Sequence, residues 1–463
     1  MSDPSTWTEL LRRPHLAPLA MLSLGIGLYA FNTFLVATAL PSAVIEIGGA
    51  ALIAWASTVF LVSAIVGGAG GAALKARLGA RGGLLLGGAA FLVGTVVCGL
   101  APTMPVLLLG RALQGVGEGI VAAISYALIP ALFPSRLVAR VFAVEAVVWA
   151  VAGLAGPVVG GVLTQAVSWR AAFLVNAPLA VLFLALVLAT VRQVKAGDAV
   201  APPLLRLAAL GGGILLIAAS SLAGAAFAVG AVAAGMAVLV IVVRLDRGRA
   251  DALFPRDAFR PGVALGAGLL VVLLMPVAHS FTVVHLTLAL QQGWGFSPIA
   301  AGALFALGPL AWSATMLAVA NSGHPGMPAF GIRFGPVLLM VGIAGQLVAV
   351  VAGMPWAMLP FLVAAGASFG LGWAFLSVAV MQAAPAAERD RAAGLVPTVQ
   401  SAGYAIGAAL AGLAASVSGL DGSSAAATVQ GFGVVVACGL VPAGLASWVS
   451  LRRRDWPQGP RID

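Results

Sequence analysis

Charged residues are scarce in this sequence. Asp, Glu, Lys and Arg make up only 8% of its 463 residues, whereas soluble domains carry about 25%. Hydrophobic residues account for 61%, so the composition excludes an ordinary soluble domain and predicts a polytopic membrane protein. The formal charge of +10 does not indicate nucleic-acid binding, because the basic residues are scattered singly and form no stripe with interleaved aromatic residues.

Cysteine and histidine are also rare. The two cysteines, Cys98 and Cys438, both lie in apolar segments, so thiols cannot build a disulfide framework or a metal cluster. The four histidines, at positions 15, 279, 285 and 324, show no metal-ligand spacing. We therefore expect no metal and no cofactor.

Two further absences concern energy supply and catalysis. The sequence has no phosphate-binding loop of the form GxxxxGK followed by Ser or Thr, so an ATP-driven function would need a separate subunit. It also has no constellation of His, Asp and Ser that would indicate a membrane enzyme or sensor. We expect no enzymatic activity.

Apolar runs long enough to cross a bilayer recur along the chain. A hydrocarbon core of roughly 30 Å needs about 20 helical residues. Fourteen runs of this kind lie approximately at residues 16–40, 51–73, 82–101, 105–131, 140–164, 171–193, 204–223, 226–244, 262–287, 298–320, 332–352, 356–381, 394–418 and 427–450. The first run is too long for a signal-peptide core, so we expect no cleavage there.

The basic residues predict how these spans are oriented. With the N-terminus in the cytoplasm, every Lys and Arg except Arg111 and Arg170 falls on the cytoplasmic side, as the positive-inside rule predicts. The rule requires an even number of crossings between Arg206 and Arg244, and the run between them is nearly twice as long as one crossing. Two spans therefore fit between these arginines. We expect the protein in the plasma (inner) membrane of the cell, with both termini in the cytoplasm.

The spans divide into six, an inserted pair and six more. We expect an N-terminal six-helix bundle over residues 1–193 and a C-terminal six-helix bundle over 261–463. Between them, residues 194–260 are expected to form a linker with two inserted transmembrane helices and a cytoplasmic surface segment. No pattern indicates an obligate oligomer, and we expect a monomer.

Two charged residues lie in the fourth predicted span. Arg111 and Glu118, in GRALQGVGEGIV, are seven residues apart and share one helix face with Gln114 and Gly115. A charge in hydrocarbon costs at least about 2.5–3.5 kcal/mol, so this face must meet a cavity or a polar interface. Two interpretations stay open: a proton or substrate relay in which Glu118 titrates, and a fixed ion pair or hydrogen-bonded clasp between helices.

The fifth predicted span carries GLAGPVVGGVL, residues 153–163. Gly156 and Gly160 are four residues apart and form a groove that lets another helix approach closely. Pro157 removes one backbone hydrogen bond and bends the helix. This span is therefore predicted to be a site of close helix packing.

Several stretches together resemble the major facilitator superfamily and, within it, the fourteen-span drug:proton antiporter branch. They are ATALPSAVIEIGG, GRALQGVGEG, GPVVGG, WRAAFLVNAP and LQQGWGFSPIAAG. The resemblance implies an all-α membrane protein with the major facilitator fold, its 14 transmembrane helices arranged as 6 + 2 + 6. It further implies alternating access of two six-helix bundles, export of hydrophobic or amphiphilic small molecules by proton antiport, and a role for Arg111 in proton coupling.

The sequence departs from the family pattern at informative positions. Asn32 stands where the branch usually carries an acid, and the position of Glu118 is usually small. One hypothesis is that Glu118 takes over the role lost at Asn32. The loop LKARLGARGG keeps Arg77, Gly79 and Arg81 of the family's gating motif but has alanine where an aspartate is expected. An exporter or flippase of a lipid or lipid-like metabolite is the alternative function.

Other polar and aromatic residues in the spans are candidates for the same machinery. His279 is a candidate for proton coupling, and Glu145 for gating, with Arg77 or Arg140 as a possible partner. The predicted substrate cavity comprises Asn32, Gln114, Trp149, Trp312, Trp373 and Gln400. Structural hydrogen bonding and plain packing are the alternatives for these residues. The expected partners are a small-molecule or lipid-like substrate, protons and the lipid bilayer, with no nucleic acid.

Overall fold

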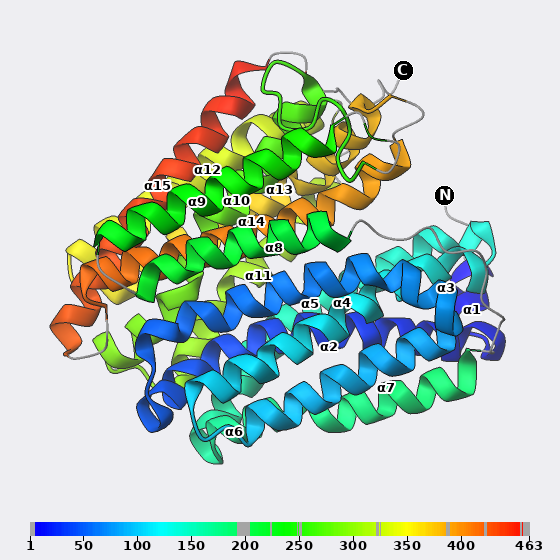
Figure 1. The fold of residues 1–463 in the computed structure, drawn as a ribbon, viewed down its shortest axis with the longest axis horizontal. Coiled ribbons are helices and arrows are strands. Elements are labelled where there is room, and N and C mark those ends of the chain that lie inside the picture. The colour runs from blue at the N-terminus through cyan, green and yellow to red at the C-terminus, as the bar shows by residue number, and fades with distance from the viewer. Residues whose placement is uncertain are drawn as a thin grey trace. The chain divides into compact units, whose positions relative to one another are not determined.

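The computed structural model consists of helices and their connections, with no strand, in the part of the chain that it describes (Figure 1), namely residues 5–191, 204–222, 225–247, 249, 252–320, 324, 326–385, 389–420, 424–453 and 456. Thirteen helices in these ranges are long and apolar enough to cross a membrane, and Leu205–Ala219 is a shorter apolar helix. The expected all-α, multi-span membrane protein is confirmed. The predicted seventh and eighth spans are separate helices, α8 (Leu204–Ala219) and α9 (Ala225–Asp246).

The chain forms two compact units. Unit 1 contains Met1–Gly48 and Val59–Gly211, and unit 2 contains Gly49–Thr58 and Gly212–Asp463. The helices that begin in unit 1 are α1 (Ser5–Leu10), α2 (Arg13–Ile47), α4 (Met104–Leu132), α5 (Ser135–Ala166), α6 (Trp169–Leu174), α7 (Asn176–Thr190) and α8, which continues into unit 2 after Gly211. The long helix α3 (Ile53–Gly99) enters unit 1 at Val59.

A sharp turn divides α3 into the predicted second and third spans. Gly79 has φ 72° and ψ 168° in the middle of the element, a conformation that glycine adopts readily because it has no Cβ. Arg77 is exposed and Arg81 half-buried on either side of this turn. The glycine of the predicted gating motif is thus the residue at which the chain reverses.

Unit 2 consists mainly of six helices and their connections. They are α10 (Ala264–Leu288), continued by the π-helical turn η3 (Ala289–Gly293), α11 (Pro298–Ala320), α12 (Met327–Val351), α13 (Leu359–Ala383), α14 (Arg389–Ser418) and α15 (Ala425–Arg452). Short 3-10 turns lie at η1 (Ala50–Leu52), η2 (Ser220–Leu222) and η4 (Pro355–Met358).

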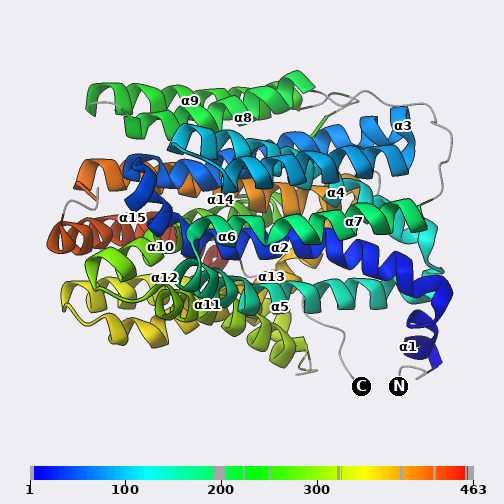
Figure 2. The same ribbon diagram turned by 90° about the horizontal axis from the view of Figure 1, so that it is seen from below.

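Each unit packs its helices in the same pattern. In unit 1, α2 is the first span and contacts α5 and α7, which belong to the fifth and sixth spans. In unit 2, α10 is the first of the last six spans and contacts α14 and α15, the fifth and sixth of them. Several of these neighbours are distant in sequence (Figure 2). Repetition of one packing scheme in two halves is typical of transporters built from internal repeats.

Small residues allow the helices of unit 1 to approach closely. A Cβ added at Gly119 of α4 would collide with the carbonyl oxygen of Ala64 in α3. At Gly160 of α5, a Cβ would collide with Thr38 Oγ1 and lie 2.7 Å from the carbonyl oxygen of Leu35, both in α2. Close backbone contact of this kind replaces the hydrophobic effect as a source of helix association within lipid.

Gly160→Ala is expected to destabilise the protein by about 1–3 kcal/mol, because the added methyl group must displace backbone of α2. Gly70→Ala is a matched control, since a Cβ there meets no atom within 4 Å and alanine favours the helix. Unfolding titrations of the two variants in detergent measure the difference. Equal stability of the two variants would show that α2 and α5 adjust without cost.

Within unit 2, the second half of α8 and the helix α9 pack near α14, the fifth of the last six spans. In unit 2, Ile217 and Ala218 form a buried cluster with Ala409 of α14, and Gly213 lies against the backbone of Gly235 in α9. Much of α9 is exposed and apolar, and Leu245 near its end is 62% exposed. A helix with an exposed apolar face of this kind is suited to contact with lipid.

Candidate functional site

A buried polar stripe lies along α4, as its residue spacing predicts. Arg111 is 3% exposed, Gln114 is fully buried, and Glu118 is 1% exposed. Arg111 Nη1 donates a 2.8 Å hydrogen bond to Gln114 Oε1, and Gln114 Nε2 donates one of 3.0 Å to Thr95 Oγ1 in the second half of α3. Gln114 therefore connects the buried guanidinium to a neighbouring span.

The guanidinium of Arg111 lies against the first of a series of aromatic rings. Its Cζ lies 4.0 Å from the ring centroid of Phe60 in α3, a distance at which cation–π attraction stabilises a desolvated charge. The rings continue from Phe60 to Tyr29 at 5.7 Å and from Tyr29 to Trp149 of α5 at 5.6 Å. The positive charge is thus buried on an aromatic surface that three helices contribute.

Glu118 differs from Arg111 in its bonding. Neither of its carboxylate oxygens has a hydrogen-bond partner in the described part of the chain, although Arg111 lies close enough for the two charges to interact. A hydrogen-bonded clasp would require bonds to that carboxylate. Arg111 thus has the hydrogen bond that a clasp requires and Glu118 has none in the described chain, and the relay and the ion pair both stay open for Glu118.

A pair of asparagines joins the first and sixth spans. Asn176 Nδ2 lies 3.4 Å from Asn32 Oδ1 and 3.4 Å from the carbonyl oxygen of Phe173, and both side chains are fully buried. Asn32 Nδ2 and Asn176 Oδ1 have no partner among the described residues. The sequence analysis missed Asn176, whose signal was a lone amide within the apolar stretch FLVNAPLAV.

Glu145 is held by the first span. Its Oε1 accepts a 3.2 Å hydrogen bond from Ser23 Oγ in α2, and its Oε2 has no partner within the described ranges. Of the two basic residues considered as partners, Arg77 is exposed, and the side chain of Arg140 lies outside what the structure describes. The α2–α5 interface thus carries Glu145, Gly156 and Gly160, and Pro157 is buried next to Gly156 in α5.

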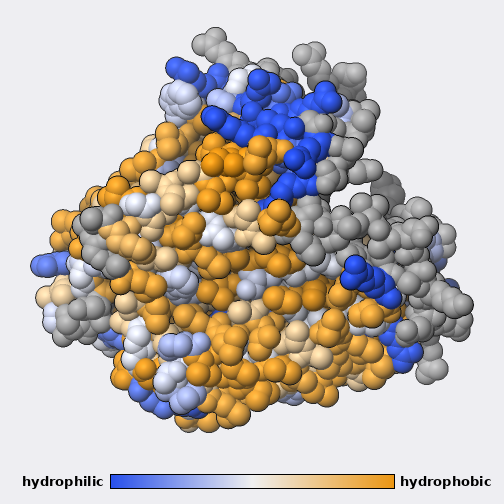
Figure 3. All heavy atoms as spheres, viewed as in Figure 1, coloured by the Kyte–Doolittle hydropathy of each residue, from blue (hydrophilic) through white to orange (hydrophobic). Residues whose placement is uncertain are grey.

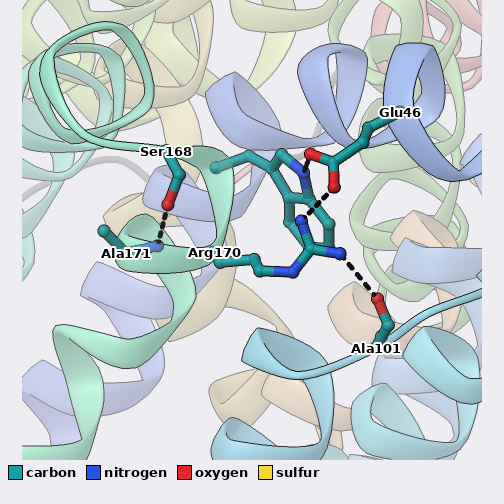
Figure 4. Close-up of polar contacts among 6 residues, drawn as sticks. Glu46, Ala101, Ser168, Arg170 and Ala171 are labelled. Carbon is teal, nitrogen blue, oxygen red and sulfur yellow. Dashed lines mark hydrogen bonds and ion pairs between the residues drawn. The ribbon is translucent and has the colours of Figure 1, made fainter.

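A polar clasp lies at the C-terminal end of α2 in unit 1 (Figure 4). Trp169 Nε1 donates a 2.7 Å hydrogen bond to Glu46 Oε2, and Arg170 Nη1 forms an ion pair with Glu46 Oε1. Arg170 Nη2 also donates to the carbonyl oxygen of Ala101 at 3.2 Å. The clasp joins the end of α2, the start of α6 and the connection between α3 and α4. Sequence reasoning missed it, although Arg170 stands out as a basic residue in a predicted outer loop.

In unit 2, four helices bring aromatic residues together around His279. Its ring centroid lies 5.2 Å from that of Phe369 and 6.5 Å from that of Tyr404. Trp312 and Trp373 pack on Phe369 at 5.1 and 5.6 Å. His279 Nδ1 has no hydrogen-bond partner in the described chain.

The predicted candidates of unit 2 therefore fall largely into one group. His279, Trp312 and Trp373 share this cluster, and Gln400 lies on α14 one turn before Tyr404, half-buried. Histidine and tryptophan each signalled a polar or bulky group within a span. The central position of Phe369 carried no such signal, because phenylalanine is common in apolar helices.

The two units present different chemistry on equivalent helices. The aromatic rings next to Arg111 in unit 1 and those around His279 in unit 2 both include residues from the first, second and fifth spans of their unit. In unit 1 the fourth span contributes Arg111, Gln114 and Glu118. The fourth span of unit 2, α13, contributes Phe369 and Trp373 and contains no charged residue. Among the described residues, no group of three His, Cys, Asp or Glu side chains is placed to hold a metal ion.

Buried polar groups on repeated bundles of apolar helices define a polytopic membrane transport protein. Comparison of the sequence with known families agrees with this class, since a sequence model of the Major Facilitator Superfamily matches residues 22–408. The chain belongs to the major facilitator superfamily. It is accordingly a multi-pass membrane transporter of small molecules and not an enzyme.

Curated relatives are similar over different lengths. A Mycobacterium tuberculosis protein (strain ATCC 25618 / H37Rv) named "Probable multidrug-efflux transporter" is 31% identical over 457 residues, covering 95% of this chain and 96% of its own length. Multidrug resistance protein 3 of Bacillus subtilis (strain 168) is 31% identical over 163 residues, covering 35% of this chain and 32% of its own length.

Solved structures share the fold at low sequence identity. A D-xylose-proton symporter matches with a TM-score of 0.65 and 16% identity, covering 93% of this chain and 97% of that one. A peptide transporter solved in complex with sulfate matches with a TM-score of 0.68 and 15% identity, covering 96% of each chain. These likenesses establish the major facilitator fold that the sequence motifs predict.

Proposed function

We propose that this protein exports hydrophobic or amphiphilic small molecules from the cell by alternating access of its two halves, coupled to proton antiport. The relative that is similar over almost the whole chain is named as a multidrug-efflux transporter. The observation that carries the coupling proposal is Glu118, a buried carboxylate without a hydrogen bond in the described structure, on the same helix face as Arg111. Intramembrane ionisable groups commonly mark proton or substrate pathways.

The candidate residues have three roles in this proposal. Proton coupling involves Arg111, Glu118 and His279. The substrate contacts are Asn32, Gln114, Trp149, Trp312, Trp373 and Gln400. Gating and the helix packing that accompanies it involve Arg77, Gly79, Arg81, Glu145, Gly156, Pro157 and Gly160.

The proposal also keeps the predicted organisation of the chain. The bundles at 1–193 and 261–463 are the two alternating halves, and the linker 194–260 joins them. The protein acts as a monomer in the plasma membrane with both termini in the cytoplasm, an orientation supported by the distribution of Lys and Arg.

Resistance of producing cells tests the function. Cells that lack their own efflux pumps and produce this protein are expected to tolerate higher concentrations of hydrophobic cations than cells producing Arg111→Ala at equal membrane levels. The alternative, export of a lipid or lipid-like metabolite, is favoured by Asn32 at the position of the expected acid. Unaltered resistance together with a changed envelope lipid composition would support that alternative.

Trp312→Ala is expected to raise the KM for an aromatic substrate about tenfold, equivalent to roughly 1.4 kcal/mol, because a ring that can stack on the substrate is removed. Trp356→Ala is the matched control, since Trp356 is 62% exposed and is not a proposed substrate contact. Initial rates of dye efflux over a range of substrate concentrations give KM and the maximal rate. A lower maximal rate at unchanged KM would assign Trp312 to packing.

A further inference from the structure

The connection between α9 and α10 is folded against unit 2. Asp246 is fully buried, and its Oδ2 accepts a 2.7 Å hydrogen bond from the backbone N–H of Phe254. The rings of Phe254 and Phe259 are 5.7 Å apart, and Phe254 is only 7% exposed. Because Ala252, Phe254 and Ala258 are buried, the outer surface of the described connection after Leu245 is left largely to the polar side chains.

Arginines dominate that outer surface. The exposed arginines of residues 244–260, which we call the arginine platform, are Arg244, Arg247, Arg249, Arg256 and Arg260. Of the aspartates in the segment, Asp246 is buried and Asp257 pairs with Arg260 at 2.8 Å, while Asp251 lies outside the described residues. Figure 3 shows hydrophilic residues gathered at the end of unit 2 where this connection lies.

Internal bonds fix the positions of several platform arginines. Arg247 Nη2 lies 3.4 Å from the carbonyl oxygen of Ala258, and Arg249 Nε donates a 3.0 Å hydrogen bond to the carbonyl oxygen of Leu245. These bonds direct the two side chains along the segment. A set of guanidinium groups held in this way loses less conformational freedom when it binds an anion.

The platform directly follows an apolar, exposed helix face. Ile241 and Leu245, in the last turns of α9, are 51% and 62% exposed. Such side chains belong in hydrocarbon, so the arginines that follow them belong at the level of the lipid headgroups. A soluble anion or an acidic protein would explain the positive charge but not its continuity with a lipid-facing surface.

We propose that residues 244–260 bind the headgroups of anionic phospholipids in the cytoplasmic leaflet. Guanidinium groups form charge-assisted, often bidentate hydrogen bonds with phosphate oxygens, and basic clusters next to a transmembrane helix attract anionic lipid. The bound lipid is a ligand of the linker and is separate from the transported substrate. The platform thereby anchors the inserted helices to the membrane surface.

Lipid binding to the purified full-length protein in detergent tests this proposal. Native mass spectrometry, with phosphatidylglycerol and phosphatidylcholine added separately, gives the affinity for each lipid. The double variant Arg244→Gln/Arg256→Gln leaves the internal bonds of Arg247, Arg249 and Arg260 in place. We expect it to lose about 30-fold in phosphatidylglycerol affinity, which corresponds to roughly 1 kcal/mol for each arginine.

The matched control is Arg12→Gln/Arg452→Gln, which removes the same charge from exposed positions outside the platform. It is expected to bind phosphatidylglycerol as the unmodified protein does. An equal loss in both double variants would reduce the effect to net charge and overturn the proposal. Displacement of phosphatidylglycerol by free glycerol phosphate at similar concentration would also overturn it, because the surface would then recognise a soluble phosphate. Neither measurement depends on transport.

Discussion

Transport by the Arg111→Ala variant is expected to fall at least about 100-fold, equivalent to roughly 2.7 kcal/mol in the barrier of the rate-limiting step, because intramembrane charged groups mark the proton pathway. The substitution removes the bond to Gln114, the contact with the ring of Phe60 and the positive charge that acts on Glu118. Substrate flux in proteoliposomes with an imposed pH gradient measures the loss.

Arg170→Ala is the control for Arg111→Ala. Arg170 also lies against an aromatic ring and a carboxylate, with its Cζ 4.3 Å from the ring centroid of Trp169, but it belongs to the half-exposed clasp of unit 1. We expect this variant to retain most of its transport. Arg111→Lys distinguishes a folding defect from a transport defect, because it keeps the charge. Full activity of a well-folded Arg111→Ala variant would show that Arg111 takes no part in transport and has at most a structural role.

Glu118→Gln is expected to abolish transport driven by a pH gradient while leaving the fold intact. The carboxylate oxygens make no hydrogen bond in the described structure, so the amide, which has nearly the same shape, breaks no structural bond. It can no longer release or take up a proton. Gradient-driven uptake and substrate exchange without a gradient, measured in the same proteoliposomes, separate coupling from binding and movement of the halves.

Glu46→Gln is the matched control for Glu118→Gln. Glu46 is an exposed carboxylate that already bonds Trp169 and Arg170, and it lies in the clasp of unit 1. Its variant is expected to weaken the clasp and to keep the response to the pH gradient. Gradient-driven transport that persists in Glu118→Gln would show that Glu118 does not couple transport to protons. It would not bear on export itself, which the resistance of producing cells tests separately.

Some features of the candidate site followed from the sequence because they belong to one helix. The seven-residue spacing of Arg111 and Glu118 places them on one face of α4 wherever that helix packs. The close approach at Gly160 likewise follows from the absence of a side chain at that position. Local periodicity and residue size determine such features without knowledge of the neighbouring helix.

The partners of these residues did not follow from the sequence. Glu145 bonds Ser23, Asn32 contacts Asn176, and Phe369 lies at the centre of the cluster around His279. Each contact joins helices that are far apart along the chain. Apolar periodicity reports that a face is buried but does not specify the surface that covers it.

By itself, the sequence determined that this is a multi-pass membrane protein, which segments are long and apolar enough to cross the membrane, and which family it resembles. The reason is that burial in hydrocarbon requires long apolar helices and keeps charge at their ends. The tertiary structure alone decided which buried polar groups are bonded: it connects Arg111 to Gln114 and Phe60, and leaves Glu118 without a hydrogen bond in the described chain. These contacts depend on how helices of similar composition pack in three dimensions, which no local pattern encodes.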